Sequence, residues 1–166
     1  MKPVQHFSED TASSALDVLS TLMGEIHAGR TIAVLAEKTF GIFQTNHREY
    51  FVRIGEGAVF LALSKFADLW DYHILTLLGD DAPSKGHGLR QEVKRKKTLE
   101  FRDLFVAHYA DREANPGPTM KKLQELMAAQ GFGNAEELES WVSDAMVAIE
   151  GVRTALGVRF KLQKKK

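Results

Sequence analysis

The sequence predicts an all-α fold, an up-and-down bundle of four to five main helices in a single domain. Apolar residues recur every three or four positions along almost the whole chain, which is the periodicity of helices buried on one side. No run of alternating apolar and polar residues predicts a strand. At 166 residues the chain is long enough to bury a substantial core, and no internal repeat divides it.

The first helix is expected to begin near Ser8. Glu9 and Asp10 suit the positive end of a helix dipole, and an apolar stripe follows at Leu16, Leu19, Met23 and Ile26. Gly24 and Gly29 weaken this helix and predict a bend or break before "RTIAVLAEKTF".

The second helix has the strongest pattern. Asn46 and Glu49 form a start that resembles a capping box. One stripe then runs through Val59, Leu63, Phe66, Trp70, His73 and Leu77, and a second through Phe51, Ile54, Ala58 and Leu61. Two apolar faces indicate a central helix that packs on several partners or on a second subunit. Gly55 and Gly57 suit a close helix crossing.

The boundaries of the remaining elements are predicted from turn-forming and helix-breaking residues. A loop is expected over 79–88, then a basic helix ending near "NPGP" (115–118), then a short helix between Thr119 and Gly131. Asn134 and Glu137 predict the start of the last helix, which is expected to end near Gly157. We therefore predict one helical domain over 1–158 and a basic C-terminal tail over 159–166.

Composition excludes several kinds of site. Without cysteine there can be no disulfide, thiolate metal site or cysteine nucleophile. The six histidines show no metal-binding spacing, so neither a metal nor another cofactor is expected. The start "MKPVQHFSED" has no apolar signal region, and no apolar run reaches membrane-spanning length. A cytoplasmic protein without membrane association is expected.

Acids and bases balance at 22 each, but the bases cluster. One block precedes the predicted motif helix and provides the candidate RNA-binding residues: Arg90, Lys94, Arg95, Lys96 and Lys97. Such a block is also typical of an ordinary solvated helix face.

The stretch "EFRDLFVAHYADRE" (100–113) contains the candidate catalytic residues. His108 follows Phe101 by seven positions and Leu104 by four, so it projects from the apolar side of its helix. Arg102 lies roughly 120° away around an ideal helix, so the two are not helical neighbours. Either the arginine reaches across, or the helix is distorted, or the groups meet at a subunit interface. Asp103 either steers the guanidinium or faces water.

The string "RDLFVAH" (102–108) resembles the Arg-x(4–6)-His signature of the HEPN superfamily. Its position after "REYFVRIGEGAVFLALSKFAD" is most similar to the AbiU-type abortive-infection branch. The resemblance spans roughly residues 10–155, although only the short motif is specific. It implies a HEPN-like bundle that forms a homodimer, with Arg102 and His108 catalytic and Asp103 at the polar position. A tyrosine two residues after the histidine marks another branch, whereas residue 110 here is alanine.

The resemblance implies a metal-independent endoribonuclease, a toxin or phage-defence effector with RNA as substrate and an antitoxin protein as a candidate partner. Two alternatives stay open. The chain can be a non-catalytic helical module that binds RNA or a partner protein, or a structural bundle in which the motif is coincidental.

Overall fold

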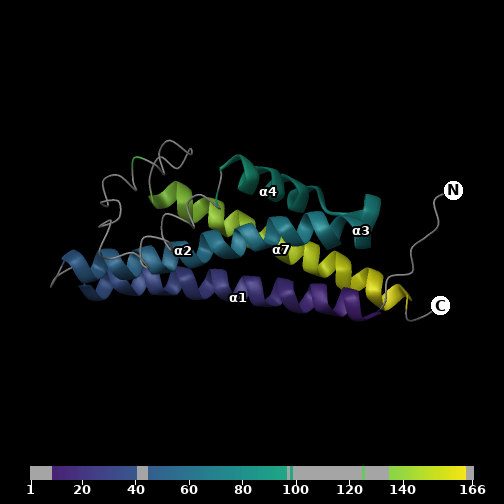
Figure 1. The fold of residues 1–166 in the computed structure, drawn as a ribbon, viewed down its shortest axis with the longest axis horizontal. Coiled ribbons are helices and arrows are strands. Elements are labelled where there is room, and N and C mark those ends of the chain that lie inside the picture. The colour runs from purple at the N-terminus through teal and green to yellow at the C-terminus, as the bar shows by residue number, and fades with distance from the viewer. Residues whose placement is uncertain (1–8, 41–44, 97, 99–124, 126–134, 164–166) are drawn as a thin grey trace, which may run out of the picture.

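The computed structural model describes residues 9–40, 45–96, 98, 125 and 135–163. These residues form α1 (Glu9–Phe40), α2 (Thr45–Leu69), α3 (Leu75–Leu78), α4 (Ser84–Arg95) and α7 (Ala135–Gln163), with a π-helix η1 (Trp70–Ile74) and a 3₁₀-helix η2 (Gly79–Asp81) between them. No strand occurs among the described residues. The predicted all-α helical bundle is confirmed. Helices α1, α2 and α7 run along its length, and α4 lies over one end (Figure 1).

Helix α1 is continuous from Glu9 to Phe40, so the predicted bend or break near Gly24 and Gly29 is wrong. Gly24 is exposed, and a Cβ atom there would meet nothing within 4 Å. Gly24 therefore lowers the intrinsic stability of α1, but the helix continues through it. Gly29 is buried and has a different role, because it faces α2.

The α1–α2 pair crosses at two facing glycines, as the sequence predicted for Gly55. A Cβ atom on Gly29 would lie 2.5 Å from the Gly55 carbonyl oxygen, and one on Gly55 would overlap the Gly29 carbonyl oxygen. The Gly55 position would also lie 2.9 Å from the backbone nitrogen of Ala33. The two backbones can approach this closely only because neither residue has a side chain.

The long second helix changes its hydrogen bonding at Trp70. In η1 the N–H of Leu75 donates to the carbonyl oxygen of Trp70, five residues earlier. Trp70 and Ile74 are both fully buried, whereas His73 is exposed. The prediction that His73 continues the apolar stripe is therefore wrong, because the wider turn brings Ile74 to the core instead.

Helix α4 begins earlier than the sequence predicted. The expected loop over 79–88 is limited to η2 and two further residues, and α4 starts at Ser84. Gly79 has a φ of 57°, which glycine adopts at little cost and which allows the sharp turn after α3. Gly86 is buried inside α4, where a Cβ atom would overlap the Trp70 ring and lie 2.6 Å from Val152 Cγ2.

Helix α7 starts at the predicted place but continues to Gln163, six residues beyond the predicted end near Gly157. Arg159, assigned to the tail from the sequence, bonds to Asp81 and donates to the carbonyl oxygen of Leu78 at 3.3 Å. These contacts attach the end of α7 to the turn after α3, so the predicted domain boundary at 158 falls within a helix.

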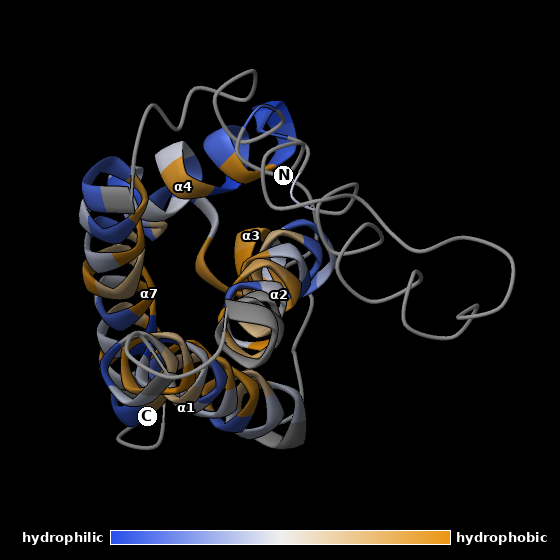
Figure 2. Cartoon of the chain, turned by 90° about the vertical axis from the view of Figure 1, so that its left-hand side faces the viewer, coloured by the Kyte–Doolittle hydropathy of each residue, from blue (hydrophilic) through white to orange (hydrophobic). Residues whose placement is uncertain are grey.

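The core lies between α1, α2, α4 and α7, and the hydrophobic parts of these helices face inward (Figure 2). Its largest fully buried side chains are Trp70, Phe60, Phe66, Leu19, Leu22, Ile26, Leu63, Ile74, Leu78 and Ile149. The second predicted stripe on α2 is not in this core, since Phe51 and Ile54 remain 36% and 39% exposed.

The glycine crossing gives a direct stability test. Gly55→Ala is expected to lower the free energy of unfolding by about 1–3 kcal/mol, because the new methyl group meets α1 backbone that cannot move without separating the helices. Gly24→Ala is the matched control, and it should raise stability by about 0.5–1 kcal/mol because its position is open and helical. Urea unfolding followed by circular dichroism measures both. Equal effects of the two changes would contradict a tight crossing.

Candidate functional site

The motif residues Arg102, Asp103 and His108 lie outside the described residues. The chain just before them is placed. Thr98 is helical and only 1% exposed, and its hydroxyl lies 2.9 Å from that of Ser64 on α2. The Ser64 hydroxyl also donates to the carbonyl oxygen of Phe60 at 2.9 Å. This buried hydroxyl pair therefore holds residue 98 against the central helix α2.

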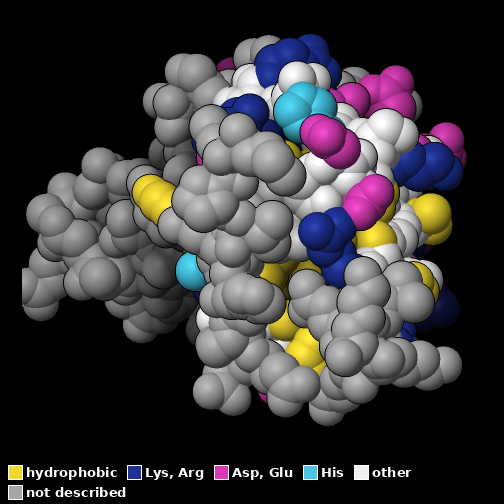
Figure 3. All heavy atoms as spheres, turned by 90° about the vertical axis from the view of Figure 1, so that its right-hand side faces the viewer, with side chains coloured by type: hydrophobic (Ala, Val, Ile, Leu, Met, Phe, Trp, Pro, Cys, Tyr) yellow, Lys and Arg dark blue, Asp and Glu magenta, His cyan; other side chains and the backbone are white. Residues whose placement is uncertain are grey.

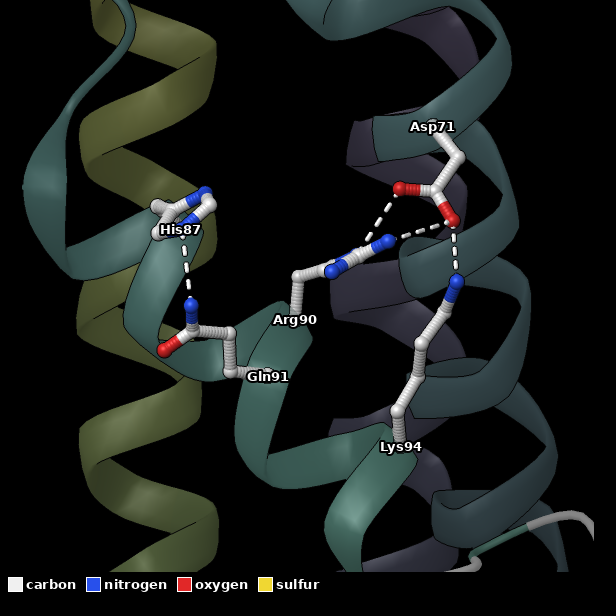
Figure 4. A network of polar contacts seen from close by, with 5 residues as sticks. All are labelled: Asp71, His87, Arg90, Gln91 and Lys94. Atoms are coloured by element: carbon white, nitrogen blue, oxygen red, sulfur yellow. Dashed lines mark hydrogen bonds and ion pairs between the residues drawn. The ribbon is translucent and has the colours of Figure 1, made fainter.

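Two of the predicted RNA-binding residues form a cluster with Asp71. Arg90 donates from Nε to Asp71 Oδ1 at 2.8 Å and from Nη2 to Oδ2 at 3.2 Å, and Lys94 bonds to the same Oδ2 (Figure 4). The Asp71 side chain is 24% exposed. Hydrogen bonding from Arg90, assisted by Lys94, holds the pKa of Asp71 below its ordinary value although burial acts in the opposite direction.

Lys96 occupies a different environment, with only 7% of its surface exposed. Its Nζ lies 5.7 Å from the centre of the Trp141 ring, a cation–π arrangement. The Trp141 indole donates to Glu92 Oε2 at 2.6 Å. Burial, followed by the nearby charge of Arg95, lowers the pKa of Lys96. The Lys96 side chain thus packs between α4 and α7, and little of it is exposed to solvent.

Arg95 is exposed and lines an open groove of about 670 Å³ between α4 and α7. Lys85 and Lys96 contribute positive charge to the groove, and Glu92, Glu137 and Asp144 contribute negative charge. The fifth predicted residue, Lys97, lies outside the described residues. Cations and anions are likewise interspersed on the end of the bundle seen in Figure 3. The described surface of the basic block is thus a mixed-charge surface.

The sequence analysis missed Asp71, Glu92 and Trp141 as partners of the basic block. Asp71 is separated from Arg90 by 19 positions, and Trp141 from Glu92 by 49. Only the packing of α4 onto η1 and α7 brings them together. The available signal was the position of Arg90 and Lys94, four residues apart on one helix face, where both can reach one acid.

No group of three or more potential metal ligands occurs within the described ranges. His87 Nε2 lies 2.9 Å from the side-chain nitrogen of Gln91 one turn later on α4 (Figure 4). The ring of His87 also lies 6.2 Å from that of Trp70. These contacts account for His87 as part of the α4–η1 packing.

Comparison of the chain with protein-family models, curated proteins and solved structures finds no match. Among the helices described, none is long and apolar enough to cross a membrane.

The Asp71 cluster predicts a pH-dependent stability. Because the pKa of Asp71 is lower in the folded state, its contribution is fully present above the unfolded-state value of about 3.9 and is lost as pH falls through the folded value. Asp71→Asn is expected to cost about 1 kcal/mol at pH 7, and the difference from the original chain should vanish at low pH.

Asp68 provides the matched control, since it is exposed one turn earlier on α2. Asp68→Asn should change the free energy of unfolding by less than about 0.5 kcal/mol at either pH. Urea titrations at pH 7 and pH 2.5 make the comparison. A cost for Asp71→Asn that persists undiminished at pH 2.5 would show that the lost charge is not its cause.

Proposed function

We propose that this protein is a metal-independent endoribonuclease of the HEPN type, acting as a toxin or phage-defence effector. The observation that carries the proposal is the motif "RDLFVAH" (102–108) in a chain that folds as an all-α bundle. An Arg–His motif of this kind arises by chance in many sequences, and the helical bundle supplies the setting in which the family resemblance has meaning.

The proposed chemistry uses the nucleophile that RNA itself carries. His108 takes the proton of a ribose 2′-OH as the oxygen attacks the adjacent phosphorus. The bond from phosphorus to the 5′-oxygen breaks, and that oxygen receives a proton as it leaves. The products are a 2′,3′-cyclic phosphate and a 5′-OH. Histidine titrates near neutral pH, so it can both accept and return a proton.

Arg102 is assigned the role of stabilising the negative charge on the phosphate. Its planar guanidinium can donate two parallel hydrogen bonds to the non-bridging oxygens, where negative charge increases in the transition state. Asp103 is assigned to orienting Arg102. On an ideal helix the six-residue spacing would separate Arg102 and His108 by about 120°, and a homodimer whose cleft combines both residues from each chain would bring them together.

The contacts of the basic block suggest how RNA reaches the cleft. Arg95 is exposed and forms the first proposed phosphate contact. Arg90 and Lys94 already bond to Asp71, so a phosphate must share or replace that carboxylate. Lys96 is buried against Trp141 and contributes mainly to stability, and Lys97 is assigned to phosphate binding from the sequence alone.

The second candidate is a non-catalytic helical module that binds RNA or a partner protein. It is favoured by the apolar side chains that remain exposed on α1 and α2: Ile32, Val34, Leu35, Phe51 and Ile54. A surface of this kind is typical of protein–protein contact. On this hypothesis the protein is dimeric or partner-bound and does not cleave RNA.

A cleavage assay separates the two. The purified protein is incubated with labelled single-stranded RNA in EDTA, and product ends are analysed for 2′,3′-cyclic phosphate. Cleavage is expected, with a loss of at least about 100-fold for Arg102→Ala and for His108→Ala.

Matched controls are available on the described surface. His27→Ala and Arg153→Ala remove an exposed histidine on α1 and an arginine that pairs with Glu150 on the same helix, at 2.7 Å. Both should retain full activity. Cleavage that survives in both motif variants would refute the assignment, and a folded protein with no cleavage at all would support the non-catalytic module.

A further inference from the structure

Helix α7 has an exposed face on the side away from the core. Figure 2 shows α7 between α1 and α4, with its hydrophobic side directed into the bundle. That buried side consists of Leu138, Val142, Ala145, Ile149, Val152 and Leu156. Val147 and Val158 lie on the opposite side and are 58% and 54% exposed. They are eleven positions apart, about three helical turns, so both point in the same direction away from the core.

The two valines belong to a regular series of exposed positions, which we call the outer face of α7. Its members follow one another at alternating steps of three and four residues: Asp144, Val147, Gly151, Thr154, Val158 and Lys161. This spacing is that of a surface where one helix packs along another. From Asp144 to Lys161 the outer face is about 26 Å long. It is therefore long enough to contact a second helix over several turns.

An antiparallel second copy of α7 fits the outer face. When Gly151 lies opposite Thr154 of the partner subunit, a two-fold axis passes between them and Val147 lies opposite Val158 of the partner subunit. The exposed valines then cover each other twice in each dimer. Gly151 is exposed, and a Cβ atom there would meet nothing within 4 Å. A glycine at the centre of the contact lets the two backbones approach closely, as at the α1–α2 crossing.

The charges of α7 favour the antiparallel direction. Residues 135–150 contain five acids and no base, whereas residues 151–163 contain three bases and no acid. An antiparallel pair brings the acidic half of each copy against the basic half of the other, with Asp144 opposite Lys161 of the partner subunit. A parallel pair would bring like charges together. Among the described residues, neither Asp144 nor Lys161 forms a hydrogen bond or ion pair, so both can pair with a second chain.

A second copy fits this face better than a nucleic acid or an unrelated protein. The acids of residues 135–150 repel phosphate, which disfavours a nucleic acid. An unrelated helix would need both the matching valine spacing and the opposite order of charges. A second copy of α7 has both, because a two-fold axis reverses the direction of the helix.

We propose that the outer face of α7 is the contact surface of an antiparallel homodimer, in which Val147 packs on Val158 of the partner subunit and Asp144 pairs with Lys161 of the partner subunit. One pair of helices buries less area than a standard stable interface, so the dimer is weak and forms reversibly. This inference rests on α7 alone, and it holds equally for a catalytic or a non-catalytic protein.

Exchange of the two charges gives a direct test. Asp144→Lys and Lys161→Asp each bring like charges together twice in the dimer, so each is expected to raise the dimer dissociation constant by at least about tenfold. The double variant should restore it to within about threefold of the original chain, because the opposite charges face each other again. Sedimentation equilibrium of the full chain measures all of them.

The matched controls make the same charge changes at exposed positions of α1. Asp17→Lys and Lys38→Asp should leave the dissociation constant unchanged. The proposal would be overturned by a chain that is monomeric at every concentration, or by a dimer that tolerates the single α7 variants. A double variant that dimerises no better than the single ones would overturn it as well.

Cross-linking tests the direction of the pair, and the chain contains no cysteine that would interfere. Val147→Cys and Val158→Cys change exposed residues, so both should fold. In an antiparallel pair, identical positions lie about 16 Å apart along the axis, whereas positions 147 and 158 lie opposite each other. With a short bis-maleimide, an equal mixture of the two variants should therefore form cross-linked dimers several-fold faster than either variant alone.

Tyr72→Cys, at a residue 75% exposed on η1, replaces Val147→Cys in the control mixture and should show no such gain. Faster cross-linking between identical positions would overturn the antiparallel arrangement, and equal rates in all mixtures would overturn the interface. RNA is absent from both experiments. A dimer that forms through another surface would therefore refute this inference and leave the proposed ribonuclease activity to its own assay.

Discussion

The backbone contact between Gly29 and Gly55 sets the distance between α1 and α2, and the other helices depend on that distance. Where two helices touch without side chains between them, their axes lie close together and the neighbouring side chains pack across the interface. Val59 packs beside this contact, and the fully buried Phe60 and Leu63 follow it along α2 in the core. Wider separation would open that core along its length. The close crossing thus accounts for two glycines inside long helices, where each costs helix stability.

A close contact at a third glycine attaches α4 to the end of the long second helix, here between glycine backbone and an aromatic side chain. Gly86 leaves room for the Trp70 ring, which occupies the space a side chain would fill. Trp70 stands at the start of the π-helix, and the same η1 turn carries Asp71, which bonds to Arg90 and Lys94 of α4. The wide turn therefore holds α4 in two ways: it directs the Trp70 ring toward Gly86 and the Asp71 carboxylate toward Arg90 and Lys94.

The all-α class, the glycine crossing and the start of α7 could be predicted because each depends on local periodicity or on a local residue type. The continuity of α1 could not, since it depends on whether Gly29 has a partner, and that partner is 26 positions away. The exposure of His73 followed from a change to π-helical bonding that no spacing rule contains. For the candidate site, the basic residues were identifiable, but their burial and pairing were not. Lys96 and Arg95 are adjacent in sequence, yet one is buried and the other exposed.

The division of roles within the basic block affects any RNA-binding function of this protein. A phosphate competes with Asp71 for the guanidinium of Arg90, because both ligands offer two oxygens to the same planar group. While Asp71 is ionised, this pair and Lys94 carry a net charge of only about +1 toward solvent. An RNA phosphate that binds Arg90 or Lys94 must compensate for the loss of their bonds to Asp71, which also hold α4 to η1. Binding at this surface and the attachment of α4 are therefore thermodynamically linked, so a change that weakens the Asp71 cluster would alter both together.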